Sequence, residues 1–360
     1  MMIQSIELKN FRNYRDLRLS FDENTNIFYG DNAQGKTNIL EAIYLSGTTK
    51  SHKGSKDRDM IYFGEEEAHL RTSVKKGEMD YRIDIHLKKH KTKGIAINGI
   101  PIRKASELFG IANFVFFSPE DLGIIKQGPS ERRRFLDLEL CQLDKVYLHN
   151  LVHYNRTIIQ RNKLLKDLAF NKDLEETLDI WDLQLAEYGK KVIEGRETFI
   201  RQLNEIISPI HQKLSGGKED LKVSYERNVS KDDFMETIRK NREKDLRLKT
   251  SSVGPHRDDL LFEVDSIDIR KFGSQGQQRT AALSLKLSEI ELVKQIIHDT
   301  PVLLLDDVLS ELDHNRQNYL LNSIHDIQTM VTCTGLDEFI NHRFLINKVF
   351  RVVEGTVTGL

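Results

Sequence analysis

The sequence has few cysteines and no long apolar run, and both absences narrow its class. Two cysteines among 360 residues are too few for a disulfide framework, which favours a reducing cytoplasm over a secreted domain. No stretch approaches the roughly 18 apolar residues of a membrane-spanning helix, and the first residues lack the basic segment and apolar core of a signal peptide. We therefore expect a cytoplasmic protein with no membrane partner.

The chain also lacks net charge of either sign. Its formal net charge is −1 although 30% of its residues are charged, so a contact with nucleic acid must rest on local patches. Basic clusters at 88–93, 132–134 and 239–242 are candidate contacts with a phosphate backbone. A solvated surface is the commoner explanation of any single cluster. Arg133 and Arg134 have two further interpretations, as structural residues of a helical arm or as sensors of nucleotide.

Aromatic residues form no stripe on which single-stranded bases could stack. This absence favours a protein that clamps duplex DNA by its backbone over one that stacks on bases.

A glycine-rich segment near the N-terminus fits the phosphate-binding pattern G-x-x-x-x-G-K-[ST]. It comprises Gly30, Asp31, Asn32, Ala33, Gln34, Gly35, Lys36 and Thr37. An expected strand at 26–29 precedes it and an expected helix at 37–45 follows, which is the context that confirms such a loop. The pattern predicts ATP and Mg²⁺ as cofactors. Lys36 reaches the outer phosphates, and the hydroxyl of Thr37 ligates the metal.

An apolar run near the C-terminus ends in two carboxylates, Asp306 and Asp307. The carboxyl end of such a strand is where an α/β sheet presents ligands to a bound phosphate. We expect Asp306 to hold Mg²⁺ directly or through water, and Asp307 to orient or deprotonate the attacking water. Taken alone, the run is also explained by a buried strand followed by an acidic turn.

The distance between these two half-sites predicts a split domain. Asp306 follows Lys36 by 270 residues, far more than one crossover connection needs. Between them, apolar positions at 143–168 and 174–210 recur in steps of three and four, the rhythm of helices that pack side by side. We predict an α/β head formed by 1–118 and 252–360, with an inserted helical arm at 119–251.

An ordinary helical subdomain without a lever function explains the arm equally well. Residues 67–103 have the pattern of an antiparallel β subdomain, with turns at Lys76-Gly77 and Asn98-Gly99.

A third motif precedes the second half-site. Ser274, Gly276 and Gln277 stand at the start of a long apolar-periodic stretch. Ser274 is a plausible helix N-cap, and the small residues leave backbone N–H groups open to an anion. A plain capped helix explains the same string.

His256 stands beside Arg257 and two aspartates. A metal site is a poor interpretation, because no second histidine lies at ligand spacing nearby and the chain has only two cysteines. We expect this histidine to act in a loop or an interface.

The order of these motifs resembles an ABC-type ATPase head of the SMC class, with 310–313 as its D-loop. Within that class the chain resembles the RecF family of bacterial recombination mediators. The resemblance rests on "LKNFRNY" at 8–14, "FSPEDL" at 117–122, "PSERRRFLD" at 129–137 and "GPHRDDL" at 254–260.

The resemblance implies an ATP-dependent homodimer. Each nucleotide lies between the phosphate loop of one subunit and the signature helix of the other, so Ser274 and Gly276 contact the γ-phosphate in trans, with Gln277 nearby. The family clamps DNA at gapped duplex and at single-strand/double-strand junctions. With RecO and RecR it supports loading of RecA in DNA repair, replication and the SOS response.

Two positions depart from the general ABC pattern. Asp307 stands where a catalytic glutamate is usual, and residues 331–334 lack the expected switch histidine. Both departures suit a weak, slow ATPase whose dimer state matters more than its flux, and the resemblance implies a DNA-stimulated one. Two alternatives remain, namely the ATPase subunit of a transporter and a structural SMC-like DNA bridge. The second needs an arm of hundreds of residues, which 360 residues cannot hold.

Overall fold

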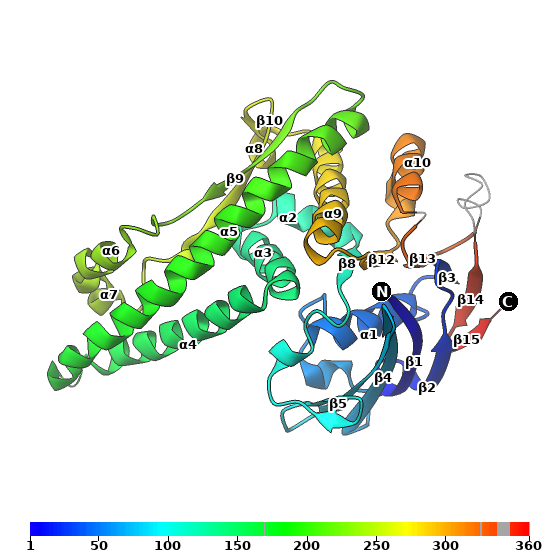
Figure 1. Cartoon of the computed structure of the whole chain (residues 1–360), viewed down its shortest axis with the longest axis horizontal. Coiled ribbons are helices and arrows are strands. Elements are labelled where there is room, and N and C mark those ends of the chain that lie inside the picture. The colour runs from blue at the N-terminus through cyan, green and yellow to red at the C-terminus, as the bar shows by residue number, and fades with distance from the viewer. Residues whose placement is uncertain (169, 171, 325, 337–345, 360) are drawn as a thin grey trace. The chain divides into compact units, whose positions relative to one another are not determined.

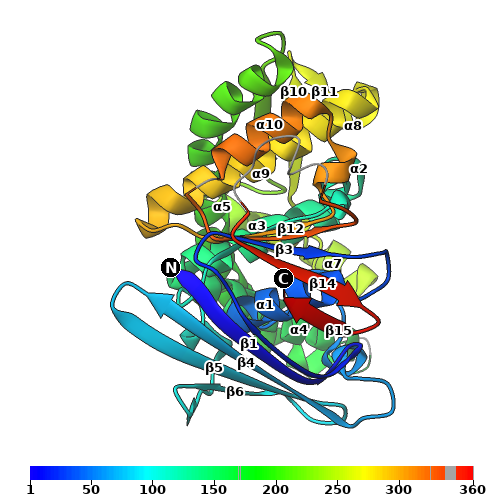
Figure 2. The same cartoon turned by 90° about the vertical axis from the view of Figure 1, so that its right-hand side faces the viewer.

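Figures 1 and 2 show the computed structural model of the chain, which describes residues 1–168, 170, 172–324, 326–336 and 346–359. The chain divides into two units. Met1–Asp121 and Glu289–Leu360 form the first, here called the head unit, and Leu122–Ser288 form the second, the arm unit. Each unit is built around its own core.

A largely parallel sheet carries the two predicted half-sites of the head unit. Its strand order is β15-β14-β3-β13-β12-β8, and only β14 and β15 are antiparallel. The strands are β3 (Thr25–Tyr29), β8 (Phe114–Phe117), β12 (Val302–Asp306), β13 (Thr329–Cys333), β14 (Lys348–Val353) and β15 (Thr356–Gly359). β12 is buried along its whole length, as expected for a parallel strand covered on both faces. Because β13 pairs with both β3 and β12, the ends of those two strands meet at one edge of the sheet.

The second sheet of the head unit is antiparallel, with the order β2-β1-β4-β5-β6-β7. Its strands are β1 (Met2–Phe11), β2 (Tyr14–Ser20), β4 (Glu67–Lys76), β5 (Met79–Lys88), β6 (Gly94–Ile97) and β7 (Ile100–Pro101). The predicted turns are present between β4 and β5 and between β6 and β7. Asn98 and Gly99 both have positive φ, which a tight two-residue hairpin turn requires.

Helix α1 (Lys36–Thr48) packs between the two sheets, with contacts to β4 and β5 of one and to β8, β12 and β13 of the other. Most of its residues are buried, including the polar side chains of Glu41, Ser46 and Thr48. The core around it includes Leu40, Phe28, Leu304 and Ile85. The head unit also contains α10 (His314–Ser323).

The arm unit is mainly helical, and its longest elements are α4 (Lys145–Asp167) and α5 (Leu178–Ser215). These two helices are antiparallel, because Arg161 late in α4 contacts Asp182 early in α5 while Tyr147 contacts Arg196 (Figure 1). This pair confirms the predicted helical insertion. The other elements are α2 (Leu122–Lys126), α3 (Pro129–Leu143), α6 (Phe234–Lys240), α7 (Arg242–Leu248), α8 (Ile269–Phe272), β9 (Leu221–Glu226), β10 (Asp259–Val264), β11 (Ile267–Asp268) and the first part of α9 (Gln275–Ile297). The rest of α9, from Glu289 on, belongs to the head unit.

The arm unit extends further along the chain than the predicted boundary at 251. β10 pairs with β9 over its whole length, and Arg132 of α3 binds Asp259 with an Nε–Oδ1 distance of 2.5 Å. Residues 252–288 therefore group with the helices. The pairing of β9 with β10 joins segments that are more than 30 residues apart in the sequence. No local sequence pattern predicts such a pairing. The other predicted boundary, at 118, lies three residues before the observed one.

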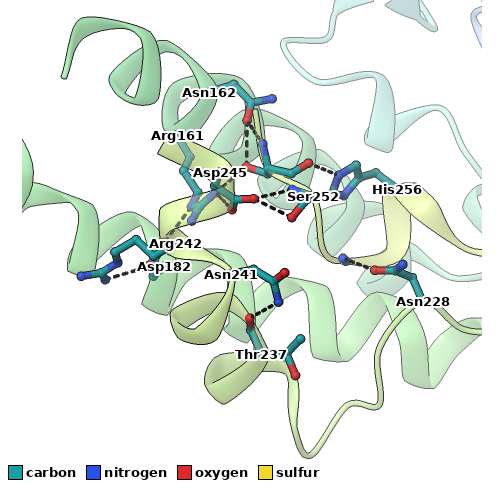
Figure 3. A network of polar contacts seen from close by, with 12 residues as sticks. Arg161, Asn162, Asp182, Asn228, Thr237, Asn241, Arg242, Asp245, Ser252 and His256 are labelled. Carbon is teal, nitrogen blue, oxygen red and sulfur yellow. Dashed lines mark hydrogen bonds and ion pairs between the residues drawn. The ribbon is translucent and has the colours of Figure 1, made fainter. Parts of the chain in front are cut away.

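A buried polar network fixes the chain after α7 to the long helices (Figure 3). The fully buried guanidinium of Arg161 binds Asp182 at 2.6 Å and Asp245 at 2.7 Å. Asp245 in turn accepts hydrogen bonds from the backbone N–H and the hydroxyl of Ser252. Removing one partner of such a group leaves an uncompensated buried charge, which costs about 3–5 kcal/mol. The network thus joins α4, α5, α7 and the segment that leads to β10.

His256 lies in the same region, and both of its ring nitrogens are hydrogen-bonded. Nδ1 is 2.6 Å from the hydroxyl of Tyr154, and Nε2 is 3.0 Å from the carbonyl oxygen of Ser251. Burial lowers the pKa of His256 to about 4. The ring is therefore a neutral structural link between α4 and the loop before β10.

Candidate nucleotide-binding site

The glycine loop between β3 and α1 has a backbone that other residues do not adopt readily. Gly30 has φ 153°, and a Cβ atom there would lie 2.3 Å from the carbonyl oxygen of Val352. Gly35 has φ 109°, and its Cβ would lie 2.3 Å from Nδ2 of Asn13. Both positions therefore require glycine. The loop leads directly into the N-terminus of α1, where backbone N–H groups favour an anion.

Lys36 reaches back across this loop. Its Nζ donates hydrogen bonds to the carbonyl oxygens of Gly30 at 2.7 Å and Asp31 at 3.0 Å. The side chain is buried by the loop that it spans. The structure therefore places the lysine ammonium inside the concavity formed by the loop.

Two hydroxyl groups converge on one carboxylate oxygen at the end of β12. Thr37 and Thr332 each donate a hydrogen bond to Oδ1 of Asp306 at 2.8 Å. Burial raises the pKa of Asp306, the two hydrogen bonds oppose that rise, and the neighbouring carboxylate of Asp307 adds to it. A carboxylate and a threonine hydroxyl beside a phosphate loop are the donor set that suits Mg²⁺.

Asp307 has φ 50°, an uncommon conformation for a residue with a side chain. Its backbone N–H donates to Oγ1 of Thr332 at 2.9 Å. The same threonine therefore orients both aspartates. Asp307 lines a hollow of about 180 Å³ together with Leu309, Ser310 and residues 332–335. This hollow offers space for water beside the carboxylate.

The turn between β1 and β2 braces the phosphate loop, a role that the sequence did not predict. Asn13 Nδ2 donates a hydrogen bond to the carbonyl oxygen of Gln34 at 3.1 Å. The hydroxyl of Tyr14 donates one to the carbonyl oxygen of Gly35 at 3.0 Å. Asn38 of α1 donates to Oδ1 of Asn13 at 2.8 Å. The motif "LKNFRNY" contained these residues, but only the fold shows that their turn meets the loop.

The predicted signature residues begin α9, in the arm unit. Gln277 N donates to Oγ of Ser274 at 3.2 Å, and Ser274 N donates to Oε1 of Gln277 at 2.9 Å. This reciprocal pair is a capping box, so the predicted N-cap is present. Ser274 and Gly276 are exposed. The structure thus groups Gly30–Thr37 with Asp306 and Asp307 in the head unit, and it assigns Ser274, Gly276 and Gln277 to the other unit.

Some members of the predicted basic clusters are engaged inside the protein. Arg132 is buried and forms a bidentate ion pair with Asp259, so the prediction that it contacts DNA is wrong. Arg242 likewise binds the buried carboxylate of Asp182 at 2.6 Å. In both pairs, a buried charge requires a partner. The exposed side chains of Lys91 and Arg239 remain candidates.

Comparisons with known proteins agree with this geometry. The family model of the RecF/RecN/SMC N terminal domain matches residues 2–355. The DNA replication and repair protein RecF of Agathobacter rectalis is 66% identical over 357 residues, covering 99% of each chain. The RecF protein of Clostridium perfringens strain 13 is 46% identical over 362 residues, again covering 99% of each.

Solved structures give the same result. A structure of the recombination mediator protein RecF with ATP in the RecFOR pathway superposes with a TM-score of 0.93 at 36% identity, covering 99% of this chain and 97% of the other. An Smc head bound to the C-winged helix domain of ScpA has a TM-score of 0.59 at 16% identity, covering 100% of this chain and 97% of the other. This second similarity is one of fold alone.

The predicted fold class, an ABC/SMC-type ATPase head with an inserted helical arm, is confirmed. Among the described residues, every helix is too short or too polar to cross a membrane. The phosphate loop, the paired aspartates and the full-length similarity lead to one conclusion: this chain belongs to the RecF family of DNA replication and repair proteins.

Proposed function

We propose that this protein is a cytoplasmic, ATP-dependent DNA-binding recombination mediator. It dimerises on ATP at gapped duplex or at single-strand/double-strand junctions, and with RecO and RecR it supports loading of RecA in DNA repair, replication and the SOS response. The observation that carries the proposal is the convergence of Thr37 and Thr332 on Asp306 beside a phosphate loop. The RecF structure with ATP in the RecFOR pathway supports ATP as the ligand.

The residues of the head unit have separate roles in this proposal. The backbone N–H groups of Gly30–Thr37 and the ammonium of Lys36 bind the phosphates. Thr37 and Asp306 would hold Mg²⁺, which would supply positive charge to neutralise the phosphates. Asp307 orients or deprotonates the attacking water. Its side chain is one methylene shorter than the usual glutamate, which favours slow turnover, and the proposal includes stimulation of that turnover by DNA.

The arm unit contributes to the proposal through α9. Ser274 and Gly276 are exposed at the start of a 23-residue helix, and a Cβ atom at Gly276 would meet only Oγ of Ser274, at 3.8 Å. An open, capped helix N-terminus of this kind suits a phosphate group presented by a second subunit. We therefore assign Ser274, Gly276 and Gln277 to the nucleotide of the partner.

Sedimentation velocity with and without Mg²⁺·ATP and gapped duplex tests the proposal. We expect a monomer without ATP, a dimer with ATP, and a slower dissociation of DNA when ATP is present. Lys163 is exposed on α4, so Lys163→Ala is a matched control for the loss of a lysine. A sedimentation coefficient and DNA retention that ATP leaves unchanged would contradict the proposal.

A further inference from the structure

Two histidines face each other on the outer surface of the antiparallel sheet. His69 of β4 pairs directly with His86 of β5. Their neighbours Leu70 and Ile85 are buried in the core, so the alternation of the strands directs both imidazoles to the opposite face. The centroids of the two rings are 3.8 Å apart, and the rings are tilted by 25°.

A carboxylate completes the group. Oε2 of Glu67 lies 2.6 Å from Nε2 of His86. One ligand atom from each of Glu67, His69 and His86 can be chosen so that all three lie within 4.8 Å of one another. Within the part of the chain that the structure describes, this is the only group of three or more such side chains.

The surface beside the histidines is hollowed. A cavity of about 530 Å³ crosses this face of the sheet, and both histidines line it. Gly94 of β6 pairs with His86, and because it has no side chain it leaves the space next to that ring open. Further ligands of a bound ion, such as water, therefore have room.

We propose that Glu67, His69 and His86 bind a divalent transition-metal ion of the Zn²⁺ class, with a remaining coordination position open to the cavity. Imidazole nitrogen and carboxylate oxygen are ligands that Zn²⁺ prefers. Tetrahedral zinc holds its ligand atoms about 3.3 Å apart, so small rotations of these surface side chains close the site.

The site arises from strand register. Glu67 and His69 are two residues apart, but His86 comes from the next strand and reaches them only because β4 and β5 pair with His69 opposite His86. The site is independent of the phosphate loop and of the proposed function.

Isothermal titration of the full chain with ZnCl₂, in nucleotide-free buffer with excess Mg²⁺, tests this proposal. We expect one Zn²⁺ per chain. His69→Asn and His86→Asn each weaken binding by at least about 100-fold, since each removes a direct ligand. His90 is an exposed histidine in the connection between β5 and β6, with Nε2 3.7 Å from Oε2 of Glu66, so His90→Asn is the matched control and leaves the affinity unchanged.

A second pair of histidines provides the competing explanation. His149 and His153 on α4 have ring centroids 4.4 Å apart and can also chelate a metal. If His153→Asn no longer binds Zn²⁺ while His69→Asn or His86→Asn binds it with normal affinity, the proposal is wrong. Absorption spectra with Co²⁺ report the ligand set directly, and circular dichroism verifies that each variant is folded.

Discussion

The hydroxyl of Thr37 donates a hydrogen bond to the carboxylate of Asp306, although 269 residues separate them in the chain. The contact exists because β13 lies between β3 and β12 and is parallel to both. The phosphate loop that follows β3 and the acidic end of β12 therefore lie at one edge of the sheet.

Lys36→Ala is expected to weaken ATP binding by about 10- to 100-fold, because it removes a charged hydrogen-bond donor from the loop. ATP-dependent dimerisation should be lost at ATP concentrations that saturate the parent protein. A fluorescent ATP analogue measures the affinity, and Lys163→Ala serves as the control. Normal affinity together with normal dimerisation would rule out the assignment of the phosphate loop.

Asp307→Asn is expected to lower hydrolysis by about 100-fold or more, because it removes a proton acceptor from the site. Asparagine tolerates the positive φ of this position, so the backbone is preserved. ATP and Mg²⁺ should still bind through Lys36, Thr37 and Asp306, and the dimer should remain longer on DNA. Phosphate release and DNA dissociation rates measure these effects. Hydrolysis at the parent rate would point to a different base.

Ser274→Arg is expected to block approach of a second subunit while the monomer still binds ATP. Dimerisation, hydrolysis and ATP-dependent DNA retention should then fall together. A mixture with Lys36→Ala offers a stricter test, since one heterodimer combines an intact phosphate loop with an intact signature helix. Partial recovery of hydrolysis in that mixture is the expected result. Normal dimerisation of Ser274→Arg alone would exclude the trans arrangement.

Asn13→Ala is expected to weaken ATP binding without removing any group that contacts phosphate. Asn13 joins Gln34 of the loop to Asn38 of α1, so its loss releases the loop backbone at a cost of about 1–2 kcal/mol. Asn228 braces the arm unit through Gly254, and Asn228→Ala should affect stability without changing ATP affinity. Equal ATP affinity in Asn13→Ala and the parent protein would show that the brace is dispensable.

Acid is expected to destabilise the arm unit through His256. The folded-state pKa is about 4, below the ordinary value near 6.5, so the unfolded chain takes up the proton first. The contribution of His256 is therefore complete above about pH 6.5 and decreases as the pH falls toward 4. It amounts to at most about 3 kcal/mol. Urea unfolding of the parent and His256→Gln at pH 7.5, 6 and 5 measures the difference. The parent should lose more stability than the variant over that range, and parallel curves would contradict the prediction.

The sequence was most informative where function depends on consecutive residues. The loop from Gly30 to Thr37 is defined by a pattern of eight consecutive residues, and the strand before Asp306 is continuously apolar. Both could therefore be predicted. The side-by-side packing of α4 and α5 also followed from periodicity, because each helix buries one stripe.

Features that depend on strand register or on tertiary contact were missed. Asn13 braces the loop only because a turn of one sheet meets the end of another. Arg132 looked like a surface charge because its partner, Asp259, is 127 residues away. The extension of the arm unit beyond residue 251 has the same origin, since it depends on the pairing of β10 with β9.

The position of β3 in its sheet has a consequence during synthesis. Both of its neighbours, β13 and β14, come from residues 329–353, so β3 has no partner strand while the preceding 300 residues are translated. At about 5–20 residues per second this interval lasts on the order of 15–60 s. An unpaired strand edge is prone to aggregation, so a growing chain must hold β3 out of contact with other chains. The same order means that a nascent or truncated chain that lacks β13 has no strand to join β3 to β12, so we expect such fragments to bind no ATP.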